Sequence, residues 1–291
     1  MSRNFYLINS TGQVMPLWDE HRFFYQPTGL GFGESTGYEQ VEYGFFARSD
    51  AKTWNQPQLG GTLVFKRGGQ DPYRTYQQFV DWMEQSTDLQ LVYVPYGGRE
   101  LYMDVELSSL ELSEKTETGV LECPIQFIGT SPYHRKNPLT FLFSTEAEGN
   151  PMEFSFAFPF AFSSSSGGDA VIFTPSGHFP AALELTVQGP VSGPYFRCEN
   201  PYTGQVYGAL DLSGVSLAEG DQIYYSSRPN ADGVWKISGG MRTDLVGALN
   251  TNLENFFTIP VGQPCRAVLQ AETAVGVEVI HTLHVHEYFK G

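Results

Sequence analysis

The sequence predicts a mainly β protein, with a β-rich N-terminal domain that contains one helix, followed by an antiparallel β-sandwich. Aromatic residues make up 14% of the 291 residues, and 31 Gly and 18 Pro recur along the chain. Aromatic side chains suit a pleated, half-buried surface, whereas Gly and Pro favour tight turns. Short runs of alternating apolar and polar residues occur in both halves, and one segment has clear helical periodicity. This combination favours strands over a helical bundle.

Alternating apolar positions predict the strands of the N-terminal half, at residues 5–8, 14–18, 59–65, 89–94, 101–112 and 120–129. The glycine-rich residues 27–37 are expected to form a loop, because they lack the Gly-Lys-Ser/Thr ending of a phosphate-binding loop. Residues 131–138 are polar and basic, contain two prolines and have no periodicity. We therefore predict a domain boundary there, with domains at residues 1–136 and 137–291.

One helix is predicted at residues 71–86. Asp71 is a good N-cap, and Pro72 at the first helical position loses no hydrogen bond, because the N–H there has no intrahelical partner. Trp82 falls beside the apolar stripe rather than on it. The stripe consists of residues at three- and four-residue spacing, which predicts one buried face: Tyr73, Tyr76, Phe79, Val80 and Met83.

The second half predicts strands at residues 171–173, 182–187, 206–212, 222–226, 234–237, 266–270 and 275–288. Short strands at regular spacing, almost without helix, are typical of an antiparallel sandwich. Phenylalanine occupies every second position over residues 154–162, and residues 163–168 have the composition of a Ser/Gly linker. Residues 244–257 fit either a helix or a loop that crosses an edge of the sandwich.

Charge and cysteine content exclude several classes of function. The formal net charge is −15, and the few Lys and Arg argue against phosphate-driven binding of nucleic acid. Cys123, Cys198 and Cys265 are an odd number without a CxxC pair, which is neither a disulfide framework nor a zinc site. No signal peptide and no apolar run of about 20 residues is found, so we expect neither secretion nor membrane insertion.

Histidines near the C-terminus are the first place to look for a metal. His284 and His286 would share one face of a strand, and with Glu278 or Glu287 nearby they could bind a metal ion. The competing interpretation is that these two residues and His281 are polar residues on the outer face of a final strand. We favour the second interpretation, and expect no metal site and no cofactor.

No catalytic residue is assigned. Ser176 lies in the sequence TPSGH, which differs from the Gly-x-Ser-x-Gly elbow of hydrolases. Asp104 and Glu106 would share a strand face and are the nearest thing to a carboxylate pair for glycoside hydrolysis. The same face carries Tyr102 and Ser108, as a solvated face would. We therefore expect the protein not to be an enzyme.

An ordered series of short segments carries a family resemblance. It runs from FYLIN at residues 5–9 through PTGLGF at 27–32, GGTLVF at 60–65, the helix, GVLECPI at 119–125 and SPY at 131–133. In this order the segments resemble the phage distal tail protein family (Dit, the siphophage-type tail component). The second half is similar in layout to the galectin-like β-sandwich of that family, with FTIPVG at 257–262 and a closing strand that ends at Tyr288 as its late strands.

The resemblance implies a structural subunit of a phage or phage-like tail tip, assembled in the host cytoplasm. It implies a homohexameric ring that joins the tail tube protein to the tail-tip hub or tail-associated lysin and to receptor-binding proteins, with the N-terminal domains forming the ring. Large aromatics off a helix's core stripe are enriched at interfaces. We therefore expect Trp82, with Tyr73 and Tyr76, at the oligomer interface. The alternative function is a carbohydrate-binding or cell-wall-degrading modular protein, in which Trp235 could stack on a sugar ring.

Overall fold

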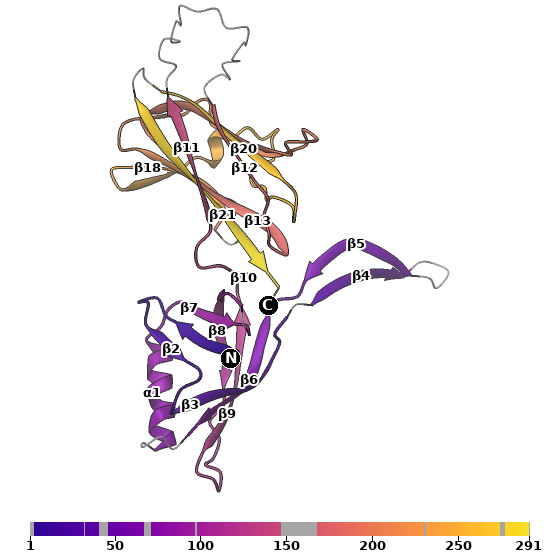
Figure 1. Cartoon of the computed structure of the whole chain (residues 1–291), viewed down its shortest axis with the longest axis vertical. Coiled ribbons are helices and arrows are strands. Elements are labelled where there is room, and N and C mark those ends of the chain that lie inside the picture. The colour runs from indigo at the N-terminus through magenta and orange to yellow at the C-terminus, as the bar shows by residue number, and fades with distance from the viewer. Residues whose placement is uncertain are drawn as a thin grey trace, which may run out of the picture. The chain divides into compact units, whose positions relative to one another are not determined.

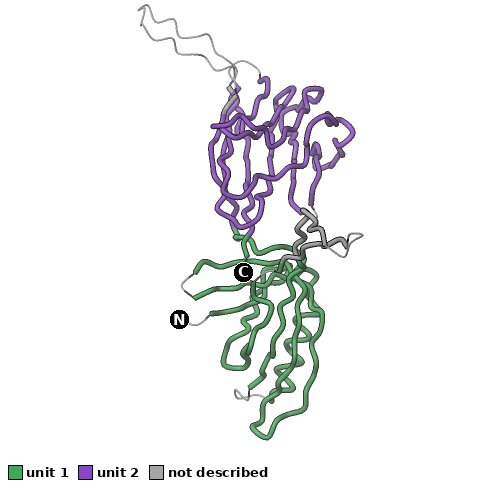
Figure 2. Tube along the Cα trace, turned by 90° about the vertical axis from the view of Figure 1, so that its right-hand side faces the viewer, with its two compact units in different colours: residues 1–136, 289–291 green, residues 137–288 purple. Residues whose placement is uncertain are grey.

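The computed structural model describes residues 3–31, 33–40, 46–66, 71–96, 98–146, 168–229, 231–273 and 277–290. The chain divides into two compact units, residues 1–136 with 289–291 and residues 137–288 (Figure 2). The described residues form strands throughout and a single α-helix (Figure 1). The predicted mainly β fold with one helix is therefore confirmed. No helix within the described ranges is long and apolar enough to cross a membrane.

Unit 1 is built on an antiparallel sheet with the order β2-β1-β7-β8-β9-β6-β3, and β10 pairs with β8. A backbone bridge between Trp18 and Phe23 joins the chain after β2 to β3. The two ends of the sheet therefore meet, and the closed sheet surrounds a core. The strands have the bounds β1 (Asn4–Ile8), β2 (Val14–Pro16), β3 (Arg22–Thr28), β6 (Gln58–Phe65), β7 (Leu89–Val94), β8 (Leu101–Leu110), β9 (Leu121–Gly129) and β10 (Tyr133–His134).

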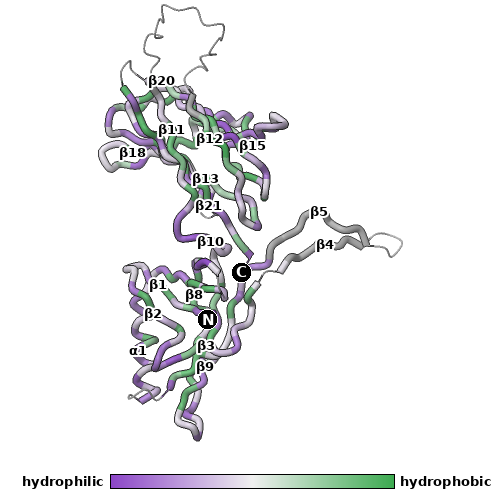
Figure 3. Tube along the Cα trace, in the orientation of Figure 1, coloured by the Kyte–Doolittle hydropathy of each residue, from purple (hydrophilic) through white to green (hydrophobic). Residues whose placement is uncertain are grey.

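Helix α1 (Pro72–Glu84) packs against this core. Asp71 caps its first turn, and the Asp71 side chain accepts a hydrogen bond from the Tyr73 backbone N–H at 3.0 Å. Phe79 is fully buried, with its ring centroid 6.0 Å from that of Phe65 on β6. Most of α1 has the hydrophilic colour in Figure 3, because only one of its faces is apolar. The predicted helix is confirmed, including its cap.

The glycine-rich segment is only partly a loop, so the expectation for residues 27–37 is wrong at both ends. Strand β3 reaches Thr28, and β4 (Glu34–Gln40) forms a two-stranded hairpin with β5 (Phe46–Trp54). Gly29 has φ +76°, and a Cβ there would lie 1.7 Å from the Gln58 carbonyl oxygen. A close backbone approach explains this glycine, because any side chain would collide with β6.

Unit 2 is a sandwich of two antiparallel sheets, with the orders β19-β18-β17-β13-β21-β11 and β12-β20-β14-β15 and with β16 paired to β14. The strands have the bounds β11 (Leu139–Glu146), β12 (Gly168–Phe173), β13 (Phe179–Gln188), β14 (Val191–Glu199), β15 (Val206–Asp211), β16 (Ser216–Leu217), β17 (Gln222–Ser226), β18 (Gly233–Ser238), β19 (Met241–Asp244), β20 (Cys265–Glu272) and β21 (Glu278–Phe289).

The two sheets of unit 2 pack on a core of their own. Phe196 stacks on Phe257 with ring centroids 6.3 Å apart, and Tyr225 lies against both rings. Residues 244–257 contain only the short 3-10 turn Val246–Ala248, and the Glu254 carbonyl accepts a hydrogen bond from Ala209 N on β15. The loop interpretation of this segment is therefore confirmed. The alternating phenylalanines at 154–162 lie outside the described residues.

Candidate assembly surfaces

Helix α1 turns a different set of side chains to the core than the sequence suggested. Thr75 is 3% exposed, whereas Tyr73 is 37% exposed. The Tyr73 hydroxyl donates to Glu114 at 3.2 Å and accepts from the Lys115 backbone N–H at 3.2 Å. Placing Tyr73 on the buried face was wrong. Thr75 lies one turn before the fully buried Phe79, at the i−4 position, so its small side chain takes the place facing the core.

Tyr76 and Trp82 flank Phe79 on opposite sides of that face. At 3.6 residues per turn, Tyr76 precedes Phe79 by three residues and Trp82 follows it by three, so they lie at its two edges. Both are half-buried and pack against the core of unit 1, and the Tyr76 ring is 5.6 Å from that of Phe65. The three expected interface residues therefore do not form one patch. Tyr73 and Tyr76 share one side of the helix, and Trp82 is on the other.

A groove of about 470 Å³ runs between α1 and β8, and we call it the α1 groove. Its acidic side chains, Glu84 and Glu106, are both exposed, and the described residues that line it include no Lys, Arg or His. Its apolar lining comes from both elements: Tyr76, Val80, Met83, Leu107 and Leu110. The α1 groove is therefore apolar inside and negatively charged at its edge.

Three aromatic side chains form a second surface of unit 1, which we call the aromatic platform: Trp18, Phe23 and Tyr25. Trp18 is 56% exposed and Tyr25 is 51% exposed. Their ring centroids lie 5.6 Å and 6.2 Å from that of Phe23. Lys66 Nζ lies 4.9 Å from the Phe23 centroid and 6.0 Å from the Trp18 centroid, within the range of cation–π attraction.

The turn that carries the aromatic platform is held by Asp19. Its carboxylate accepts hydrogen bonds from the backbone N–H groups of His21 and Arg22, at 2.8 and 2.7 Å, and pairs with Arg22 Nε at 3.0 Å. Beside the platform lies a hollow of about 390 Å³ whose lining includes Arg3 and no acidic residue. The exposed rings are therefore fixed in place by a rigid turn.

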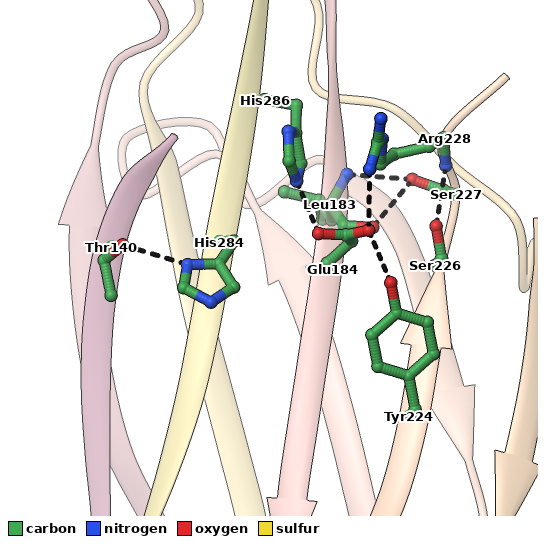
Figure 4. A network of polar contacts seen from close by, with 9 residues as sticks. All are labelled: Thr140, Leu183, Glu184, Tyr224, Ser226, Ser227, Arg228, His284 and His286. Carbon is green, nitrogen blue, oxygen red and sulfur yellow. Dashed lines mark hydrogen bonds and ion pairs between the residues drawn. The ribbon is translucent and has the colours of Figure 1, made fainter. Parts of the chain in front are cut away.

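The outer face of the β17-β13-β21 sheet in unit 2 carries a polar network (Figure 4). The Glu184 carboxylate accepts from the Tyr224 hydroxyl at 2.5 Å and from Arg228 Nη1 at 3.2 Å, and it lies 2.6 Å from His286 Nε2. Burial raises the pKa of Glu184, but the hydrogen bonds from His286 and Tyr224 outweigh it and lower the pKa to about 2. The carboxylate is thus ionised and already fully engaged within the unit.

Trp235 on the same face is covered on both sides of its ring. The Arg242 guanidinium lies 3.5 Å from the ring centroid, and the Tyr224 ring stacks on it at 5.6 Å. Arg242 and Tyr224 come from β19 and β17, the two neighbours of β18, so they cover opposite faces. This arrangement does not favour the alternative in which Trp235 stacks on a sugar, because Arg242 and Tyr224 occupy its two ring faces.

The three C-terminal histidines have different surroundings. His284 and His286 share the outer face of β21, as predicted, and His284 Nδ1 lies 2.9 Å from Thr140 Oγ1 (Figure 4). His281 is fully buried, so placing it on the outer face was wrong. Its Nδ1 accepts from Gln188 N at 3.0 Å, and burial lowers its pKa to about 4. Within the described residues no group of three or more His, Cys, Asp or Glu could hold a metal ion.

The residues considered for catalysis are engaged in local hydrogen bonds. Ser176 Oγ donates to Glu287 Oε1 at 2.8 Å. Asp104 accepts from Gln90 Nε2 at 2.8 Å, while Glu106 is exposed at the edge of the α1 groove. The same Glu287 oxygen also accepts from the Ser176 backbone N–H, so this carboxylate joins the turn at Ser176 to β21.

Residues 4–130 match the family model described as distal tail protein, N-terminal domain. Residues 4–130 therefore form a distal tail protein (Dit) N-terminal domain. The match covers strands β1 to β9 and helix α1 of unit 1, including both the aromatic platform and the α1 groove. No curated protein matches the chain. The family match thus lies within unit 1 and agrees with the ordered segments seen in the sequence.

Solved structures extend the likeness to the whole Dit fold. The SPP1 Dit protein, described as a paradigm of the hub adsorption apparatus in phages that infect Gram-positive bacteria, has a TM-score of 0.61 at 9% identity, covering 97% of this chain and 98% of that chain. A chain of the phage P2 baseplate in its activated conformation has a TM-score of 0.56 at 13% identity, covering 98% of both chains. At such identities the likeness concerns the fold, which spans both units.

The aromatic platform was missed by sequence reasoning. A signal was present, since Trp18 and Tyr25 flank the paired phenylalanines Phe23 and Phe24. Phe24 is 5% exposed, and alternation along β3 sends its two neighbours to the opposite face. The sequence does not say which of the two faces is covered, so the exposed one could not be chosen.

Proposed function

We propose that the chain is a structural subunit of a phage or phage-like tail tip, in which six copies form a ring that joins the tail tube to the baseplate hub. The observation that carries the proposal is the match of residues 4–130 to the distal tail protein N-terminal domain. The whole-chain likeness to SPP1 Dit and to a phage P2 baseplate chain supports it. In this role unit 1 forms the ring, and unit 2 is available to receptor-binding parts or to a tail-associated lysin.

We place the protein at the tail tip of the virion, after its assembly in the host cytoplasm. The net charge of −15 supports this role, because a negatively charged ring lets DNA pass without adhering to it. The engagement of Ser176 and Asp104 in local hydrogen bonds supports a structural rather than a catalytic role. Negative-stain images of the purified chain test the proposal: we expect six-fold rings, and single particles at all concentrations would contradict it.

Helix α1 has a part in this ring. Tyr73 and Tyr76 lie on the side of α1 that borders the α1 groove, and Trp82 supports the opposite edge of the helix against the core. We therefore propose two different roles for these three residues. Tyr76 contacts the neighbouring copy, with Tyr73 next to it, whereas Trp82 fixes the position of α1 on which that contact depends.

A further inference from the structure

Unit 1 leaves two apolar surfaces open, and they share no residue. The aromatic platform exposes Trp18 and Tyr25 by about half of their surface. The α1 groove, at about 470 Å³, is in the size range of cavities that hold a ligand or the anchoring side chains of a partner. Exposed aromatic clusters and apolar grooves are both typical of protein contact sites.

The lining of the α1 groove and the lining of the hollow beside the platform differ in charge. The residues that line the α1 groove include Glu84 and Glu106 and no cation, whereas those that line the hollow beside the platform include Arg3 and no acid. Lys66 adds a second cation over the platform rings. On the turn that carries the platform, Asp19 is paired with Arg22 Nε at 3.0 Å, and the exposed Glu20 lies 3.2 Å from His21 Nε2. Two α1 grooves paired with each other would set their glutamates against each other, which is unfavourable.

We propose that the aromatic platform of one copy of this chain docks into the α1 groove of the next copy. Trp18 and Tyr25 are the anchors that enter the groove, and Arg3 meets the acidic edge formed by Glu84 and Glu106. Such a contact is heterologous, so every copy uses one platform and one groove, and repeated contacts close into a ring when the rotation between copies divides a full turn. The inference rests on the proposed ring and names the surfaces that build it.

The contact explains two features that the fold of unit 1 does not require. The rigid Asp19 turn holds half-exposed aromatics in place, which reduces the entropy lost when they bind. The groove carries Glu84 and Glu106 beside apolar residues, and an Arg from a partner would satisfy their charge. Docking thus covers the apolar surface and pairs the charges in one step.

Two double variants separate the surfaces. The platform variant carries Trp18→Lys and Tyr25→Lys, and the groove variant carries Thr87→Lys and Ser108→Lys. All four side chains are exposed, and Thr87 and Ser108 line the α1 groove, so both variants are expected to keep the wild-type circular-dichroism spectrum. The control is Tyr202→Asp, which changes an aromatic that is 84% exposed in unit 2.

We expect each double variant alone to need at least about 30-fold more protein than the wild type to assemble, the factor for losing an interface anchor. The control is expected to assemble as the wild type does. An equal mixture of the two variants is expected to form a dimer and nothing larger, measured by light scattering. One intact platform meets one intact groove in the mixture. Of the two surfaces left over, one has lost its aromatic anchors and the other has two lysine side chains in its groove.

Other outcomes overturn the inference in distinguishable ways. If the wild type forms rings and either variant does so equally well, the ring stands and a different surface builds it. If the groove variant alone assembles normally, the groove belongs to another tail protein or to no partner. If the mixture stays monomeric, the contact is not head to tail. A wild-type chain that is monomeric at all concentrations overturns both the ring and this contact.

Discussion

Trp18 in unit 1 and Trp235 in unit 2 both stand on the outer side of a β-sheet, but only one of them is covered. Trp235 is held between Arg242 and Tyr224, and the Tyr224 hydroxyl is bound to Glu184. Trp18 is 56% exposed, with the Phe23 ring centroid at 5.6 Å and Lys66 Nζ at 6.0 Å from its ring. The face around Trp235 satisfies its own polar and aromatic groups, whereas the platform leaves aromatic surface for a partner. The two surfaces differ in whether their polar and aromatic groups find partners within the chain, and not in residue type.

Removing a core side chain gives the largest effect and tests whether the two units unfold separately. Phe79→Ala in α1 is expected to cost unit 1 about 3–5 kcal/mol, because Phe79 is fully buried against Phe65. Calorimetry should show the transition of unit 1 at lower temperature and that of unit 2 unchanged. Gln78→Ala, at an exposed neighbouring position, is the control and should change the free energy by less than about 0.5 kcal/mol. Equal shifts in both transitions would contradict separate cores.

Acid is expected to act on unit 2 through His281. The folded pKa of about 4 lies below the ordinary value of 6.5, so between these values the unfolded chain binds a proton that the folded unit does not. Stability is therefore present above about pH 6.5 and is lost as the pH falls towards 4, by about 2 kcal/mol. Urea denaturation of unit 2 at pH 7.5 and 4.5 measures this loss.

A matched pair of variants isolates that histidine. His281→Gln keeps an acceptor for Gln188 N and is expected to flatten the pH dependence, whereas His178→Gln, at an exposed position, should leave it unchanged. A pH slope that survives in His281→Gln would assign the acid sensitivity to another group.

The polar network around Glu184 predicts a smaller loss. Glu184→Gln removes the charge that Arg228 and His286 face, and we expect unit 2 to lose about 1–2 kcal/mol at pH 7. Because the folded pKa of Glu184 is about 2 and its ordinary value is 4.5, the loss should shrink as the pH falls through this window. Glu219→Gln, at an exposed position on the same unit, is the control. An unchanged midpoint of urea denaturation for Glu184→Gln would mean that the network does not contribute to stability.

Trp82→Ala is expected to have the smallest effect on folding. Trp82 is half-buried at the edge of α1, so unit 1 should remain folded by circular dichroism while ring formation is weakened. Sedimentation velocity across a concentration series measures the shift in assembly. If the variant forms rings as readily as the wild type, Trp82 has no role in assembly. If unit 1 unfolds in the variant, Trp82 is a core residue only.

The helix and most strands could be predicted because their signals are local. The Asp71-Pro72 cap and the spacing of Phe79 and Met83 are set by helix geometry, and hairpin strands alternate with period two. The burial of His281 could not be predicted, because its hydrogen-bond partners, Thr145 and Gln188, are distant in sequence. Which side chains form an exposed surface depends on which face of a strand is covered, and the tertiary fold decides this.

The mass of the purified wild-type chain, measured by light scattering over a range of concentrations, tests the central claim most directly. With a chain mass of 32.4 kDa, we predict a species of six times that mass whose population rises with concentration. The aromatic platform and the α1 groove would then be covered in the ring. A mass of 32.4 kDa at every concentration would contradict the claim that unit 1 builds a ring by itself.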